Sequence, residues 1–243
     1  MWTIVKRELI NFFWTPQGYV LLGTFFILNG LMAWVFPTPF NLLDAGFGDL
    51  YLFFELNPWI LVFFIPALGM KSFTEEIRSG TLNLLLSKPL SRTALVMGKF
   101  IALLCILFVG LTLAFFYLFI IHSLLIDTHS IDMGVFIGSF LGLFLLATTL
   151  VAISLWASTL VGSPFTAFFI AFFVSIFHFY GWQQMGNMFS DYSLHETLSS
   201  LALHHQYSTL NKGVIRISNL FYLLSQTALF LYGCSINLKK HSQ

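Results

Sequence analysis

The residues most able to do chemistry lie together between Lys71 and Lys99. This stretch holds seven of the chain's charged residues, and the sequence on either side is almost entirely apolar. The adjacent carboxylates of Glu75 and Glu76 can form ion pairs with basic groups. Ser72 stands three residues before Glu75, which is the spacing of a helix capping box. We expect a short charged helix exposed to water, whose carboxylates either contact a partner or only cap the helix.

The sequence contains no pattern typical of a nucleotide-binding or metal-binding site. A phosphate-binding loop needs G-x-x-x-x-G-K-[ST], and the nearest candidates, Gly69–Ser72 and Gly98–Phe100, lack that spacing. His204 and His205 are adjacent, so on a helix they point about 100° apart and do not form an i, i+4 metal pair. We therefore expect no metal site and no cofactor in this chain.

The sequence also shows no arrangement of side chains typical of a catalytic site. Ser175 and His178 are three residues apart in an apolar run, but the sequence places no third group or oxyanion donor near them. Cys105 and Cys234 lie in apolar runs where a small hydrophobic residue fits. We expect no catalytic residue, and an intramembrane enzyme remains only an alternative.

A few polar residues stand inside otherwise apolar runs. Glu55 and Asn57 precede a proline at one end of an apolar run, and an ionisable group at membrane depth suggests gating or contact with a substrate. Ser225 and Gln226 lie along one side of the last apolar run. They could line a translocation path or form hydrogen bonds between helices.

Composition places all of these residues in a membrane protein. Charged residues make up 9% and hydrophobic residues 58% of the 243 positions, and the mean hydropathy is +0.86. Water-soluble chains carry roughly a quarter charged residues. A membrane core about 30 Å thick needs about 20 helical residues. The sequence therefore predicts an all-α polytopic membrane protein, one transmembrane domain over residues 1–243, with six spans at about 18–36, 52–70, 100–121, 133–155, 164–180 and 217–236.

Orientation follows from the basic residues, because Lys and Arg favour the cytoplasmic side. With the N-terminus inside, nine of the eleven Lys and Arg residues fall in inside segments. The loops at 37–49 and 122–132 contain none and carry aspartates instead. We expect a multi-pass protein of the bacterial inner membrane with both termini in the cytoplasm. The net charge of +1 gives no reason to expect nucleic acid as a partner.

Three segments outside the spans have predicted roles. Residues 1–16 have apolar and charged residues on opposite sides and are typical of an amphipathic helix in the membrane interface. Residues 71–99 form the cytoplasmic charged segment. Residues 181–216 form an outer loop, in which Ser193 and Glu196 have capping-box spacing before a short amphipathic helix.

Glycines recur at four-residue intervals in the fourth span. Gly134, Gly138 and Gly142 lie on one helical face, and such a stripe lets another segment of this or a second chain pack closely. The alternative is a flexible hinge at these glycines.

The central stretch also resembles a known family. The run PWILVFFIPALGMKSFTEEIRSGTLNLLLSKPLSRTALVMGKF, residues 58–100, is similar to the second span, coupling segment and third span of type-two ABC exporter permeases. The flanking sequences at 12–20, 41–50 and 211–231 resemble more narrowly the gliding-motility permease subunits of the GldF type. Position 83, directly after Gly80-Thr81-Leu82, holds an asparagine, whereas relatives often have an acidic residue at this position.

This resemblance implies a non-catalytic permease subunit with six helices that works with a separate ABC ATPase. ATP and Mg²⁺ would bind to that ATPase, which agrees with the missing phosphate-binding loop. The segment between spans two and three would be the coupling helix. The residues expected to couple to the ATPase are Glu75, Glu76, Arg78, Gly80, Thr81 and Pro89.

The resemblance also implies further partners. These are a second permease copy in a homodimer, membrane lipid and an accessory membrane protein with an extracytoplasmic domain. ATP hydrolysis would drive export or work on gliding-type envelope machinery. The alternative is a structural or regulatory component of a larger envelope complex that moves no solute.

Overall fold

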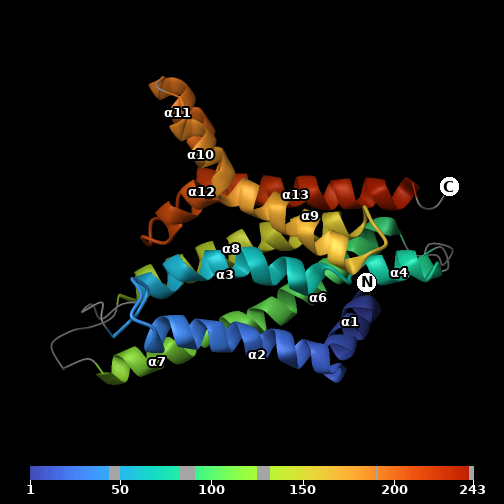
Figure 1. Cartoon of the computed structure of the whole chain (residues 1–243), viewed down its shortest axis with the longest axis horizontal. Helices are drawn as coiled ribbons and strands as arrows, with labels where there is room; N and C mark the ends of the chain where they lie inside the picture. The colour runs from blue at the N-terminus through green and yellow to red at the C-terminus, as the bar shows by residue number, and fades with distance from the viewer. Residues whose placement is uncertain (44–49, 83–90, 125–131, 190, 241–243) are drawn as a thin grey trace.

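The described part of the chain is helical throughout. The structure is a computed structural model that describes residues 1–43, 50–82, 91–124, 132–189 and 191–240. Most of the long helices run side by side along the long axis of the molecule (Figure 1). Five of the described helical segments are long and apolar enough to cross a membrane, and they are Pro16–Val35, Tyr51–Arg78, Arg92–Ser123, Met133–Ser158 and Pro164–Asn187. The chain is therefore a multi-pass membrane protein.

These five segments contain the first five predicted spans. Four of them are built from more than one helical element. The elements are α2 (Pro16–Gly30) with the π-helix η1 (Leu31–Val35), α3 (Tyr51–Gly69) with α4 (Thr74–Arg78), α6 (Arg92–Leu111) with α7 (Leu113–Leu124), α8 (Met133–Ser158), and α9 (Pro164–Ile176) with the π-helix η2 (Phe177–Gly181) and α10 (Trp182–Asn187). The fifth segment thus continues beyond its predicted end at residue 180.

The sixth predicted span corresponds to α13 (Ile217–Lys240). This helix is long enough to cross a membrane, but it is not one of the five segments above because polar residues such as Asn219, Gln226 and Asn237 interrupt its apolar sequence. It lies alongside α8 and extends toward the C-terminus (Figure 1). Six membrane crossings therefore remain a prediction.

Helix α8 forms the centre of the bundle and packs against both α3 and α13. Buried hydroxyls connect these helices. Thr149 Oγ1 lies 3.1 Å from Thr227 Oγ1 and donates to the carbonyl of Leu223 at 3.2 Å, both in α13. Ser154 Oγ donates to the carbonyl of Ile65 in α3 at 3.4 Å. Such hydrogen bonds and close packing hold helices together in lipid, where apolar contacts give little preference over lipid tails.

The predicted N-terminal helix is α1 (Trp2–Trp14), and it folds back against the bundle. It turns sharply into α2 at Thr15, and Pro16 occupies the first position of α2. Ile4 and Val5 are buried, and Ile4 packs directly over Gly98 of α6. α1 and α4 (Thr74–Arg78) therefore lie at the same end of the molecule (Figure 1). The position of α1 in a membrane interface stays a prediction.

The outer-loop prediction of one short amphipathic helix was too simple. Between residues 181 and 216 the structure has α10, α11 (Tyr192–Ser200) and α12 (Leu203–Leu210). The cap of α11 is Asp191, whose carboxylate accepts from the Ser193 backbone N–H at 2.9 Å, so Ser193 is inside the helix rather than its cap. α10 and α11 pack on each other and project sideways from the bundle (Figure 1).

Gly138 and Gly142 of the α8 stripe face α12 and the residues that follow it, not another long helix of the bundle. A Cβ at Gly142 would lie 2.6 Å from Leu210 Cβ, and a Cβ at Gly138 would lie 3.0 Å from the Cα of Gly213. At Gly134 a Cβ would approach only Asp132, the cap of the same helix. Two of the three glycines therefore admit close packing within one chain.

We predict that Gly142→Ala lowers the stability of the protein in detergent. Overpacking a closed contact costs about 1–3 kcal/mol, which exceeds the roughly 1 kcal/mol gained from replacing glycine in a helix. Thermal unfolding followed by circular dichroism measures the change. The matched control is Gly23→Ala in α2, where a Cβ would meet nothing within 4 Å. Equal unfolding temperatures for the two variants would contradict the packing described here.

Candidate functional site

The charged segment begins with a helix shorter than the sequence suggested. The predicted capping box at Ser72 and Glu75 is wrong, because the N-cap residue of α4 is Phe73 and no side chain caps the helix start. The carbonyl of Ser72 instead accepts a hydrogen bond from Lys99 Nζ. The helix ends before Gly80, whose φ of +71° favours glycine. Pro89 lies outside the described residues.

Lys99 is a buried cation near the start of the third span. Its side chain is 3% exposed, although it belongs to an otherwise apolar face of α6. Its Nζ lies 2.9 Å from Glu76 Oε1 of α4 and 3.2 Å from Glu8 Oε1 of α1. The Nζ also stands 4.9 Å from the centre of the buried Phe73 ring. One ammonium group therefore connects three separate helices.

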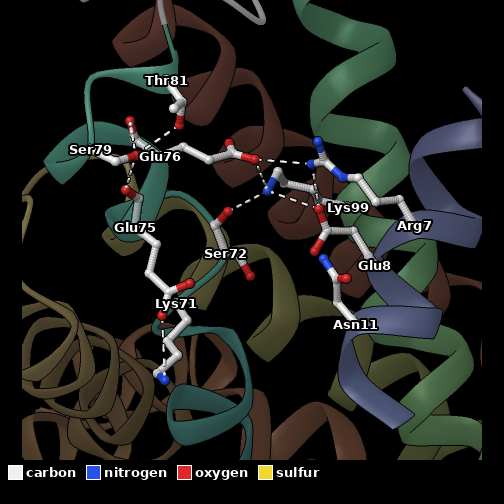
Figure 2. Close-up of a pocket in the computed structure, with 10 residues that line it drawn as sticks. All are labelled: Arg7, Glu8, Asn11, Lys71, Ser72, Glu75, Glu76, Ser79, Thr81 and Lys99. Atoms are coloured by element: carbon white, nitrogen blue, oxygen red, sulfur yellow. Dashed lines mark hydrogen bonds and ion pairs between the residues drawn. The ribbon is translucent and has the colours of Figure 1, made fainter. Parts of the chain in front are cut away.

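Arg7 completes this arrangement from α1. Its Nη2 atom donates to Glu76 Oε1 at 3.0 Å and to Glu8 Oε1 at 2.7 Å. We call Arg7, Glu8, Glu76 and Lys99 the ion cluster (Figure 2). The two cations and the two carboxylates alternate in space. Because their numbers are equal, the cluster is neutral overall.

The ion cluster stabilises the folded chain only while all of its members are present. Removing one partner of a buried ion pair costs about 3–5 kcal/mol, because the charge that remains is desolvated and unpaired. The side chain of Glu76 is only 14% exposed, so water compensates little of that loss. Within the described residues, Glu76 Oε2 and Arg7 Nε are buried without a hydrogen-bond partner. These two atoms keep unused hydrogen-bonding capacity beside the cluster.

The other face of α4 points toward water. Glu75 is 51% exposed and pairs with Lys71 at 3.3 Å, a surface pair that is worth at most about 1 kcal/mol. Arg78, Ser79 and Thr81 are also exposed. The two adjacent glutamates therefore differ, since Glu76 is held inside the chain and Glu75 remains available.

A polar cavity of about 470 Å³ separates these two groups of residues. The ion cluster forms one wall, and α4 with the residues after it forms the other (Figure 2). The lining residues are Arg7, Glu8, Asn11, Lys71, Ser72, Glu75, Glu76, Ser79, Thr81 and Lys99.

The remaining side of the charged segment packs on the helical bundle through apolar residues. Ile77 packs on the core near Gly162, and Leu82 is almost fully buried. The structure assigns Leu82 to the interior, because α4 and the residues after it fold onto the bundle.

The polar residues proposed for gating have different surroundings. Asn57 is fully buried, and its Nδ2 donates to Asn29 Oδ1 of α2 at 2.9 Å, so it joins α2 to α3. Glu55 is partly exposed in the first turns of α3. Ser225 is exposed and donates to the carbonyl of Tyr222, while Gln226 is partly exposed. The structure does not bring Glu55 or Asn57 together with Ser225 and Gln226 at one site.

Sequence reasoning missed Arg7, Glu8 and Lys99 as site residues. The available signal was Lys99 itself, a charged residue that continues into the apolar sequence of the third span. Its two carboxylate partners lie 91 and 23 positions away in the sequence. No local spacing rule connects residues at those separations.

The environment of Glu8 shifts its acidity. Burial alone would raise the pKa of its carboxyl group, but the charges of Lys99 and Arg7 and their hydrogen bonds outweigh burial. The pKa of Glu8 therefore lies below its ordinary value of 4.5. Glu8 consequently stays ionised in the folded protein at pH values where the unfolded chain already binds the proton.

Comparison with known proteins gives one family. The family model described as "ABC-2 family transporter protein" matches residues 17–237. The match includes Glu76 and Lys99 but begins after α1, which supplies Arg7 and Glu8. No curated protein matches the chain.

We predict that the stabilisation from Glu8 is lost at low pH. Because the folded pKa is the lower one, this stabilisation is fully present above about pH 4.5 and disappears as the pH falls through the folded pKa. Unfolding midpoints of wild type and Glu8→Gln, measured in detergent from pH 7 to pH 3, should converge in the acid range. A constant difference between the two proteins over that range would contradict the ionised state of Glu8.

Proposed function

The chain belongs to the ABC-2 family of transporter proteins, and from that premise we propose that this membrane permease subunit couples to an ABC ATPase through α4. The observation that carries the proposal is the division of α4 into two faces. Its inner face is fixed by the ion cluster, and its outer face presents Glu75, Arg78 and Ser79 to water. The ATPase would bind and hydrolyse ATP with Mg²⁺ in its own chain.

Rigid attachment makes α4 suitable for transmitting movement. Glu76 is held by Lys99 of α6 and by Arg7 of α1, and α4 continues directly from the end of α3. A displacement of α4 would therefore move α1 and the ends of the second and third spans together. Packed helices move between a few discrete arrangements rather than deforming continuously.

The residues of the charged segment would have separate roles in this coupling. Glu75, Arg78 and Thr81 are exposed and would contact basic and polar groups of the ATPase, which sets orientation more than affinity. Glu76 would hold α4 in place from behind. Gly80 would let the chain turn out of the helix, because its positive φ is strained for other residues.

The wider assembly follows from the family and the exposed apolar surfaces. Only 28% of the first span and 22% of the fifth are buried within the chain, so lipid and a second permease copy would cover them. The charged end with α1 and α4 would face the cytoplasm of a bacterial inner membrane, with both termini inside. Work on gliding-type envelope machinery with an accessory protein rests on the narrower sequence resemblance.

We predict different results for charge reversal at the two adjacent glutamates. Glu75→Lys should reduce co-purification of the ATPase and its stimulated hydrolysis while the permease keeps its unfolding temperature, because Glu75 is exposed. Glu76→Lys should destabilise the permease itself, because it places three cations together inside the ion cluster. Pull-down, ATPase assays and thermal unfolding of the co-expressed complex measure these effects.

The matched control is Glu196→Lys, which reverses an exposed charge on α11 at the far end of the molecule. This variant should bind the ATPase normally. Undiminished ATPase binding and stimulation in Glu75→Lys would remove the proposed docking face.

A further inference from the structure

A second cavity of about 270 Å³ adjoins the polar cavity beside the ion cluster. The two cavities share Glu8, Asn11, Lys71, Ser72, Glu75 and Lys99 in their walls. The second cavity reaches past the corner between α1 and α2 and along the ends of α3 and α6. Together they form what we call the corner cleft, within the size range of about 300–1,000 Å³ typical of small-molecule sites.

The inner part of the corner cleft is apolar. Its walls come from the end of α1, the start of α2, the end of α3 and the first half of α6. The apolar lining residues are Phe12, Leu21, Leu68, Ala102, Leu103 and Ile106. A hydrocarbon chain fits such a wall, because all of these residues except Phe12 lie in segments long and apolar enough to cross a membrane.

The mouth of the corner cleft is polar and carries both signs of charge. Its basic groups are Arg7, Lys71 and Lys99, and its carboxylates are Glu8, Glu75 and Glu76. Lys71 Nζ donates a hydrogen bond to Gln17 Oε1 at 2.5 Å, at the corner where α1 meets α2. Arg7 Nε and Glu76 Oε2 are buried without a hydrogen-bond partner among the described residues, so a ligand would reach the exposed Lys71 and Glu75 rather than these two atoms. A ligand head with one anionic and one cationic group would complement this mouth.

We propose that the corner cleft binds a zwitterionic phospholipid of the phosphatidylethanolamine type. The phosphate lies toward Lys71 and Arg7, the ammonium group lies toward Glu75 and Glu76, and an acyl chain enters between Leu21 and Leu103. The mouth carries three basic groups and three carboxylates and so has no net charge, which makes a headgroup with a net charge less complementary than a zwitterion. The site requires no ATPase and therefore stands independently of the proposed function.

The apolar depth of the cleft favours a lipid over a side chain of a soluble partner. Leu21, Leu103 and Ile106 lie inside segments long and apolar enough to cross a membrane. A water-soluble protein docked on α4 would reach the polar mouth but would leave this wall empty. A membrane lipid has a polar head joined to apolar chains, so one molecule can occupy both the mouth and the wall.

The test is a lipid titration of the purified full chain in detergent, read by native mass spectrometry. Phosphatidylethanolamine and phosphatidylglycerol with identical acyl chains are compared. We expect one phosphatidylethanolamine to bind at least about tenfold more tightly than phosphatidylglycerol. Lys71→Gln should weaken this binding about tenfold by removing a charge-assisted contact, and Leu21→Trp should weaken it by filling the apolar part.

Two variants serve as controls. Lys6→Gln removes an exposed cation of α1 that does not line the cleft, and Leu28→Trp adds an indole to α2 outside it. Both should bind the lipid as wild type does. Lys71 is exposed and Leu21 is partly exposed, so both test variants should fold, which thermal unfolding verifies.

Three outcomes would overturn the proposal. The first is equal or tighter binding of phosphatidylglycerol, and the second is unchanged lipid binding in both Lys71→Gln and Leu21→Trp. The third is that a cysteine at position 21 is protected from labelling by the ATPase and not by the lipid, which would assign the cleft to a protein partner.

Discussion

The constraint on which this structure depends is the burial of one cation, Lys99, at the end of a helical bundle. A buried ammonium group is stable only when carboxylates and carbonyls surround it. The carboxylates come from α1 and α4, and the carbonyl belongs to Ser72 just before α4. Burying Lys99 therefore requires α1, α4 and α6 to meet at one place.

This requirement explains the architecture around the charged segment. α1 folds back from α2 and packs over Gly98, one residue before Lys99, so that Arg7 and Glu8 reach the cluster. α4 turns Glu76 inward and leaves Glu75 outside. The same arrangement leaves a charged mouth above an apolar wall where α1 meets α2. On the function that we propose, a segment held in this way would pass movement from an ATPase to the spans.

Part of this account could be predicted from the sequence and part could not. Five membrane-crossing segments and the short charged helix follow from hydropathy and charge, which are properties of consecutive residues. The pairing of Lys99 with Glu8 and Glu76 depends on how distant segments pack, and no local pattern carries that information. The capping box at Ser72 failed for a related reason, since Lys99 takes the Ser72 carbonyl and the helix starts one residue later than the motif suggested. The glycine stripe predicted a close contact, but its partner became visible only with α12 in place.

The most direct test of the ion cluster is the distance between α1 and α4 with and without Lys99. Spin labels at Lys6 and Ser79, both exposed, report this distance by double electron–electron resonance in lipid nanodiscs. Wild type and Lys71→Met, which lacks the surface pair with Glu75 and the hydrogen bond to Gln17 but keeps the ion cluster, should give one narrow distribution. Lys99→Met should broaden it or shift it to longer distances, because Glu8 and Glu76 lose one of the two cations they share, and Arg7 alone leaves the cluster with an unbalanced negative charge. An unchanged narrow distribution in a folded Lys99→Met protein would contradict the claim that this buried cation holds the three helices together.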